Sequence, residues 1–71
     1  MKDLTDYLDA INASDNVVDA KSNTALMIQY SLATAEKKES SSRQLQEMDS
    51  VVAIQTFAYN FALSGEGLKV I

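Results

Sequence analysis

The sequence predicts an all-α fold, with a short N-terminal helix followed by a helical hairpin or one long kinked helix, completed by oligomerisation. Proline is absent and both glycines lie near the C-terminus, so backbone chemistry alone breaks no helix before them. Apolar residues recur at helical spacing, first at Leu4, Tyr7, Leu8 and Ile11. Residues 50–65 contain no charged residue, which indicates a helix buried on several sides.

The first element is expected at residues 1–13 as a short acidic helix. Asp3, Asp6 and Asp9 lie toward its N-terminal end, where carboxylates interact favourably with the helix dipole. The short polar side chains of residues 12–16 follow, and such side chains favour caps and turns. We therefore expect the first interruption there.

The second element is expected at residues 24–64, as a helical hairpin or one long helix. Residues 36–44 are polar throughout, and the three consecutive serines among them weaken a helix. The same stretch is also compatible with a solvated helix, because Glu39 and Arg43 form an i,i+4 pair. We favour a bend, and both alternatives stay open. Residues 65–71 follow as an apolar tail.

The length of 71 residues predicts a single small domain, residues 1–71, that needs additional stabilisation. A core of this size rarely supplies more than about 3–5 kcal/mol. Cysteine is absent, which excludes disulfides and thiolate metal sites, and histidine, the commonest metal ligand and general base, is absent too. Oligomerisation or a bound partner is the remaining source of stability, and the alternative is an idealised helix pair that is stable without a partner.

The charge and hydropathy of the chain limit which partners it is expected to bind and where in the cell it is expected to lie. The net charge of −4 argues against nucleic acid, which requires a basic surface. The uncharged segment 50–65 is shorter than the ~20 apolar residues of a membrane span, so we expect no membrane span. Aspartates follow Met1 and Lys2 where a signal peptide would be apolar. We expect synthesis in the cytoplasm without a cleavable signal peptide, and export to the cell surface stays open.

No group of residues indicates catalysis, a metal site or a cofactor. Glu47 and Asp49 are two positions apart and so point to different faces of a helix. The serines have no histidine to activate them. The N-terminal aspartates lack the spacing and the glycine of a calcium loop. We therefore expect a protein that is not an enzyme, with no catalytic residue, no metal and no cofactor.

The uncharged C-terminal helix is the predicted interface. Phe57 and Phe61 share one face while Tyr59 points elsewhere, and one partner helix in the same chain does not cover both faces. Ordinary core packing in a helical hairpin is the alternative, but aromatic residues are favoured interface anchors. The predicted interface residues are Leu45, Met48, Val52, Ile54, Phe57, Tyr59, Phe61, Leu63, Leu68, Val70 and Ile71.

Two segments carry a resemblance to a known family. Residues 23–30 have the sequence Asn-Thr-Ala-Leu-Met-Ile-Gln-Tyr, and residues 48–57 have the sequence Met-Asp-Ser-Val-Val-Ala-Ile-Gln-Thr-Phe. They resemble the entry to the second helix and the C-terminal polymerisation segment of type III secretion needle and inner-rod subunits. Pilins of plant-associated systems are a looser neighbour. Thr24 replaces the family's usual proline, the two segments lie closer together than usual, and the chain extends beyond the family's usual end.

The resemblance implies a short helical hairpin that is secreted and polymerises into a hollow tube, with its C-terminus buried. Together with the uncharged helix, it predicts a non-enzymatic, self-assembling helical subunit, a component of a filament, needle or pilus. The alternative is a small cytoplasmic helical chaperone or adaptor that binds a partner helix. The predicted partner is accordingly either a copy of the chain itself or one helical protein.

Overall fold

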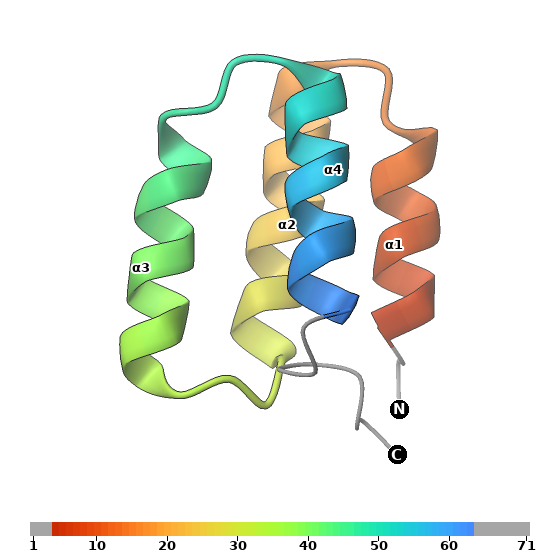
Figure 1. The fold of residues 1–71 in the computed structure, drawn as a ribbon. Coiled ribbons are helices and arrows are strands. Elements are labelled where there is room, and N and C mark those ends of the chain that lie inside the picture. Colours follow the sequence, from red (N-terminus) through yellow and green to blue (C-terminus); the bar gives the residue numbers. More distant parts are fainter. Residues whose placement is uncertain (1–3, 64–71) are drawn as a thin grey trace.

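Four helices joined by short turns make up the computed structural model, which describes residues 4–63 (Figure 1). The helices are α1 (Leu4–Ala13), α2 (Val17–Tyr30), α3 (Ala35–Gln46) and α4 (Val51–Phe61). The described residues contain no strand. The predicted all-α class is therefore confirmed.

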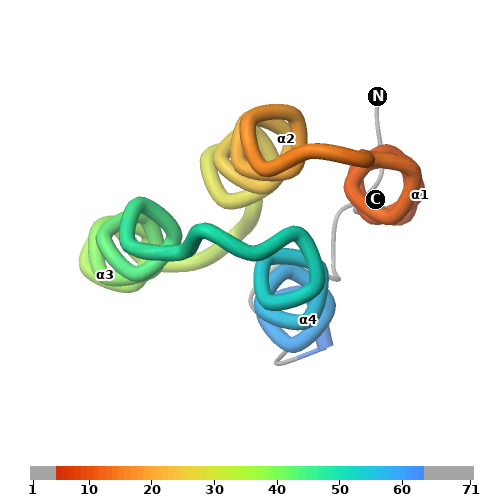
Figure 2. Tube along the Cα trace, turned by 90° about the horizontal axis from the view of Figure 1, so that it is seen from above, coloured from red at the N-terminus to blue at the C-terminus, as the bar shows by residue number. Residues whose placement is uncertain are grey.

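Helix α2 is the centre of the arrangement. It packs against α1, α3 and α4, and α4 also packs against α1, whereas α3 stands at the edge and packs chiefly on α2 (Figure 2). The Cα radius of gyration is 10.8 Å. A folded chain of this length is expected to have about 11 Å, so the single chain reaches the compactness of a folded domain.

The expected hairpin or long helix over residues 24–64 is instead divided among α2, α3 and α4. The polar stretch 36–44 lies inside α3, and the bends lie on either side of it, at residues 31–34 and 47–50. The stretch stays helical because its polar side chains face solvent along most of α3 and Arg43 pairs with Glu39 at 3.4 Å. The structure therefore adopts the helical alternative.

The start of each later helix is fixed by a polar cap. Asn16, Thr34 and Ser50 precede α2, α3 and α4, and each side-chain oxygen accepts a hydrogen bond from the backbone N–H three residues later, at 2.9, 3.1 and 3.3 Å. Such caps satisfy N–H groups that have no partner within the helix. Asn16 belongs to the interruption expected at residues 12–16.

The carboxyl ends of the first three helices are capped from neighbouring helices. Each end presents backbone carbonyls without an intrahelical partner. The donors are Gln55 Nε2 to Ile11 O (3.2 Å), Lys38 Nζ to Gln29 O (3.0 Å) and Lys21 Nζ to Gln46 O (2.9 Å). Helices α2 and α3 thus exchange lysine caps, because each donates a lysine to the last turn of the other.

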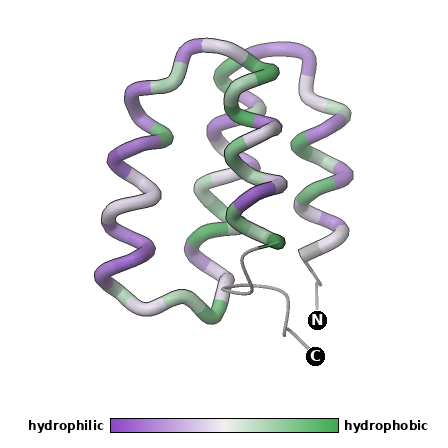
Figure 3. Tube along the Cα trace, viewed as in Figure 1, coloured by the Kyte–Doolittle hydropathy of each residue, from purple (hydrophilic) through white to green (hydrophobic). Residues whose placement is uncertain are grey.

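The core lies between α1, α2 and α4, and α3 adds little to it. The apolar core residue that α3 supplies is Leu45, and its other buried side chain is Ser41. Figure 3 shows α3 as mostly hydrophilic or neutral. The buried apolar residues are Ile11, Ala20, Met27, Ile28, Leu45, Ile54, Ala58, Phe61 and Ala62.

One polar atom inside the bundle has no hydrogen-bond partner. Thr24, on α2, is fully buried, and its Oγ1 is the buried side-chain N or O atom that has no partner in the described part of the chain. Burying a hydroxyl without a partner costs free energy because the hydroxyl gives up its bonds to water. The unpaired hydroxyl of Thr24 therefore lowers the free energy of unfolding of the protein.

We expect Thr24→Val to raise the free energy of unfolding by about 1 kcal/mol, because valine keeps the shape and removes the unpaired hydroxyl. Thr24→Ser should lower it by about 1 kcal/mol, since it removes a buried methyl group and keeps the hydroxyl. Urea denaturation followed by circular dichroism measures both changes. A loss of stability in Thr24→Val would show that Oγ1 has a bonding partner in solution.

Candidate functional site

The predicted interface residues separate into two groups by burial. Leu45, Ile54 and Phe61 are buried within the single chain, and Met48 and Phe57 are half-buried against the same core. The prediction placed these residues against another chain because it allowed only one partner helix. The structure supplies three further helices, and two of them, α1 and α2, pack against this side of α4. In this fold the five side chains stabilise the chain itself.

The predicted interface residues that are exposed form a stripe along α4 and just beyond its end. Val52, Tyr59 and Leu63 are 69%, 54% and 56% exposed. With Thr56, which is also exposed, they occupy positions i, i+4, i+7 and i+11, which share one side when the chain is helical, and Leu63 lies two residues beyond the end of α4. We call these four residues the α4 stripe. Helix α4 has no charged residue, so the stripe is uncharged as well as largely apolar.

The stripe points outward because the opposite side of α4 is anchored. Ile54, Ala58 and Phe61 are buried on that opposite side. Gln55 lies between the two sides, and its amide donates to the carbonyl of Ile11 at the end of α1. The buried residues and this hydrogen bond together set the rotation of α4 about its axis. The remaining predicted interface residues, Leu68, Val70 and Ile71, lie outside the described residues.

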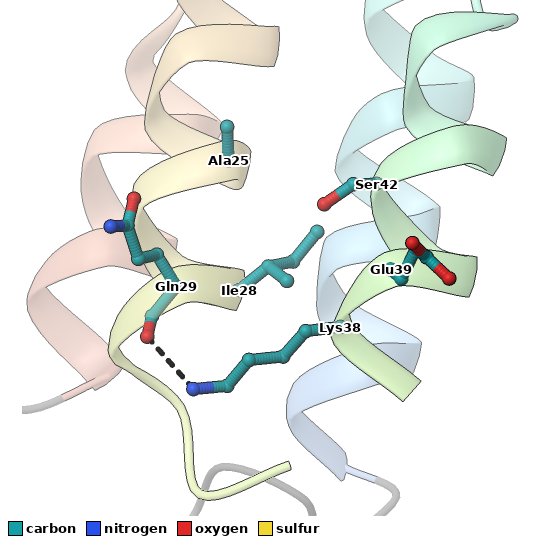
Figure 4. Close-up of a pocket in the computed structure, with 6 residues that line it drawn as sticks. All are labelled: Ala25, Ile28, Gln29, Lys38, Glu39 and Ser42. Atoms are coloured by element: carbon teal, nitrogen blue, oxygen red, sulfur yellow. Dashed lines mark hydrogen bonds between the residues drawn. The ribbon is translucent and has the colours of Figure 1, made fainter. Parts of the chain in front are cut away.

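A groove between α2 and α3 is the second surface feature (Figure 4). Its volume is about 260 Å³. Ile28 points into it from α2, and Lys38 crosses from α3 to the carbonyl of Gln29. The lining residues are Ala25, Ile28, Gln29, Lys38, Glu39 and Ser42.

Sequence reasoning did not find this groove. From the sequence, the three serines at 40–42 predict a weakened helix and no groove. Their small size is the relevant property, because Ser42 faces Ile28 and leaves the space between α2 and α3 unfilled. One sequence signal could have indicated the groove. It is a run of small residues on one helix that faces a large apolar residue of the neighbouring helix.

Charges are separated across the bundle. Within residues 4–63, every lysine and arginine lies on α2 or α3, namely Lys21, Lys37, Lys38 and Arg43. Helix α1 carries Asp6 and Asp9 and no cation. Figure 2 places α1 and α3 at opposite sides of the bundle. One side of the described structure is therefore acidic, while α3 carries three cations and two glutamates.

One exposed aromatic side chain already has a partner within the chain. Tyr30, at the end of α2, stacks on Tyr7 of α1, with ring centroids 6.1 Å apart and planes inclined by 18°. Tyr59 is the remaining tyrosine, and it lies in the α4 stripe. The rings of Tyr7 and Tyr30 therefore join α1 to α2, whereas Tyr59 has a different environment.

Residues 4–63 contain neither a metal-binding cluster nor a helix that could span a membrane. No group of three or more acidic side chains lies close enough together to hold a metal ion. None of the four helices combines the length and the apolar character needed to cross a membrane. The α4 stripe and the α2–α3 groove are thus the surface features on which we base a functional argument.

Comparison with known proteins gives no match, whether to a family model, to a curated protein or to a solved structure. We therefore infer the function from the geometry of the described residues. The resemblance to needle and inner-rod subunits stays a prediction from the two sequence segments that carry it.

The division of α4 into a buried and an exposed side can be tested by two substitutions. Phe61→Asp should abolish the helical circular dichroism signal at 25 °C, because a buried carboxylate costs several kcal/mol and a core of this size supplies about 3–5 kcal/mol. Tyr59→Asp should retain the signal, because Tyr59 is 54% exposed. Equal loss of helix in both variants would place Tyr59 in the core.

Proposed function

We propose that the protein is a non-enzymatic helical subunit that associates with copies of itself through the α4 stripe. One observation carries the proposal. After the chain has covered its own core, three large apolar side chains remain exposed: Val52 and Tyr59 on α4, which has no charge, and Leu63 just beyond its end. Contiguous apolar surface of this kind is typical of protein–protein contacts.

The absence of charge supports association between copies in particular. The chain has a net charge of −4, so two copies repel each other at most of their surface. A contact through α4 brings no like charges of that helix together and desolvates no ionised group of it. A contact through α4 therefore adds no repulsion between charges of that helix.

The stripe by itself supplies modest affinity. Complete burial of a large apolar side chain contributes about 1.5–3 kcal/mol, and the three side chains of the stripe are already partly covered, so together they contribute roughly 3–5 kcal/mol. A dissociation constant of 1 mM corresponds to about 4 kcal/mol. Stable assembly therefore requires further contacts, either from other surfaces or from residues 64–71.

The resemblance to type III secretion subunits suggests the form of assembly. It implies a filament, needle or pilus component that is exported without a cleavable signal peptide. The resemblance also implies a two-helix hairpin, whereas the described residues form four helices. From this resemblance we therefore take self-association as the primary proposal. We propose a filament as the assembled form.

A cytoplasmic chaperone or adaptor is the second candidate. The compact single chain, with a radius of gyration of 10.8 Å, favours it, because a preformed bundle can present the α4 stripe to a helix of another protein. Light scattering of the pure protein separates the two candidates. Growth in particle mass with concentration supports self-assembly, and a monomer at all concentrations supports the adaptor.

We expect Val52→Asp and Tyr59→Asp each to abolish self-association, because the carboxylate would have to lose its water at the contact. Asn60→Asp is the matched control, since Asn60 is exposed next to the stripe but outside it. Multi-angle light scattering measures the particle mass of each variant. If all three variants assemble like the unaltered protein, the stripe is not the contact surface.

Deletion of residues 66–71 tests the predicted contribution of Leu68, Val70 and Ile71. We expect weaker assembly, because these apolar side chains add area that the stripe lacks. Helical circular dichroism should change little, since the four helices end before this segment. Unchanged assembly would exclude the tail from the contact and leave the stripe as the proposed site.

A further inference from the structure

We propose that copies associate head to tail, with Tyr59 of one copy entering the α2–α3 groove of the next. The inference rests on the proposed self-association and specifies which surface receives the α4 stripe. Three observations carry it: the size and lining of the groove, the placement of groove and stripe on different helices, and the separation of charge.

The groove suits a single side chain with a polar end. Its volume of about 260 Å³ lies just below the ~300–1,000 Å³ of typical small-molecule sites. Ala25 gives it an exposed apolar edge and the buried Ile28 lies at its floor, while Gln29 and Ser42 provide hydrogen-bonding groups at its border. Tyrosine has an apolar ring and a hydroxyl that seeks a partner when buried. Of the large exposed side chains in the stripe, Tyr59 has this combination.

The groove and the stripe belong to different surfaces. No residue of α4 lines the groove, and the stripe lies on the side of α4 opposite its buried residues. A copy therefore cannot fill its own groove with its own stripe. A contact between two different surfaces is heterologous, and it leaves one unused stripe and one unused groove on every pair. Repetition of the contact produces a ring or an open filament.

Charge favours this pairing over a stripe-to-stripe contact. The charges at the groove already have partners, because Glu39 pairs with Arg43 and Lys38 donates to Gln29 O. An uncharged helix can enter without leaving them unpaired. Helix α1 packs beside α4, so head-to-tail contact brings its aspartates toward the α3 side of the next copy, where the cations lie. A stripe-to-stripe contact would bring two acidic α1 helices together.

The experiment mixes two variants that each lose one surface. Tyr59→Arg removes the inserted side chain, and Ala25→Arg fills the groove from an exposed position on α2. We expect each variant alone to be monomeric and an equimolar mixture to form a 1:1 dimer, because each variant retains the surface that the other lacks. Analytical ultracentrifugation measures the species. Asn60→Arg and Ser22→Arg are the matched controls, and they should assemble like the unaltered protein.

The outcomes separate this inference from the proposed function. If the unaltered protein is monomeric at every concentration, the proposed self-association fails. If it assembles and Ala25→Arg assembles equally well, self-association holds and the groove is not used. If both variants are monomeric and their mixture stays monomeric, the head-to-tail contact is likewise wrong. Ser42→Arg fills the groove from α3 and should give the same results as Ala25→Arg, while circular dichroism confirms that the variants are folded.

Discussion

Hydrogen bonds from one helix to the last carbonyls of another join the helices of this fold at their ends. The described residues contain neither proline nor glycine, so no residue ends a helix by its backbone alone. Gln55, Lys38 and Lys21 each come from a neighbouring helix, so each bond joins the end of one helix to the helix that lies beside it. Helix α3 depends on these bonds most, because it contributes one apolar side chain, Leu45, to the buried core.

The sequence was sufficient to predict helices and insufficient to predict their number. The interruption near Asn16 carries a local signal, since short polar side chains cluster there. The turn at residues 31–34 carries a weaker one, and there the Ser31 hydroxyl donates to Ile28 O and so replaces helical bonding. The caps from Lys21 to Gln46 and from Gln55 to Ile11 join residues 25 and 44 positions apart along the chain. No local sequence pattern indicates which distant residue caps the end of a helix.

The prediction placed the interface on the C-terminal helix and separated Tyr59 from Phe57 and Phe61, but it did not indicate which side is buried within the chain. Nearly every position of α4 is apolar, so helical spacing could not distinguish Ile54, which is buried, from Val52, which is exposed. The distinction arises from the packing of α1 and α2 on one side. The α2–α3 groove was absent from the prediction because it depends on what a small side chain leaves empty, which requires the position of Ile28 relative to α3.

The distribution of the three tyrosines has a spectroscopic consequence. The sequence contains no tryptophan, so tyrosine dominates the near-ultraviolet emission of the protein. Tyr7 and Tyr30 lie within stacking distance, which couples their emission to the docking of α1 on α2. Tyr59 stands apart on the outer side of α4, and its emission responds to the solvent around that side. One chain therefore contains two unlabelled optical reporters, one of its folding and one of whatever covers its last helix.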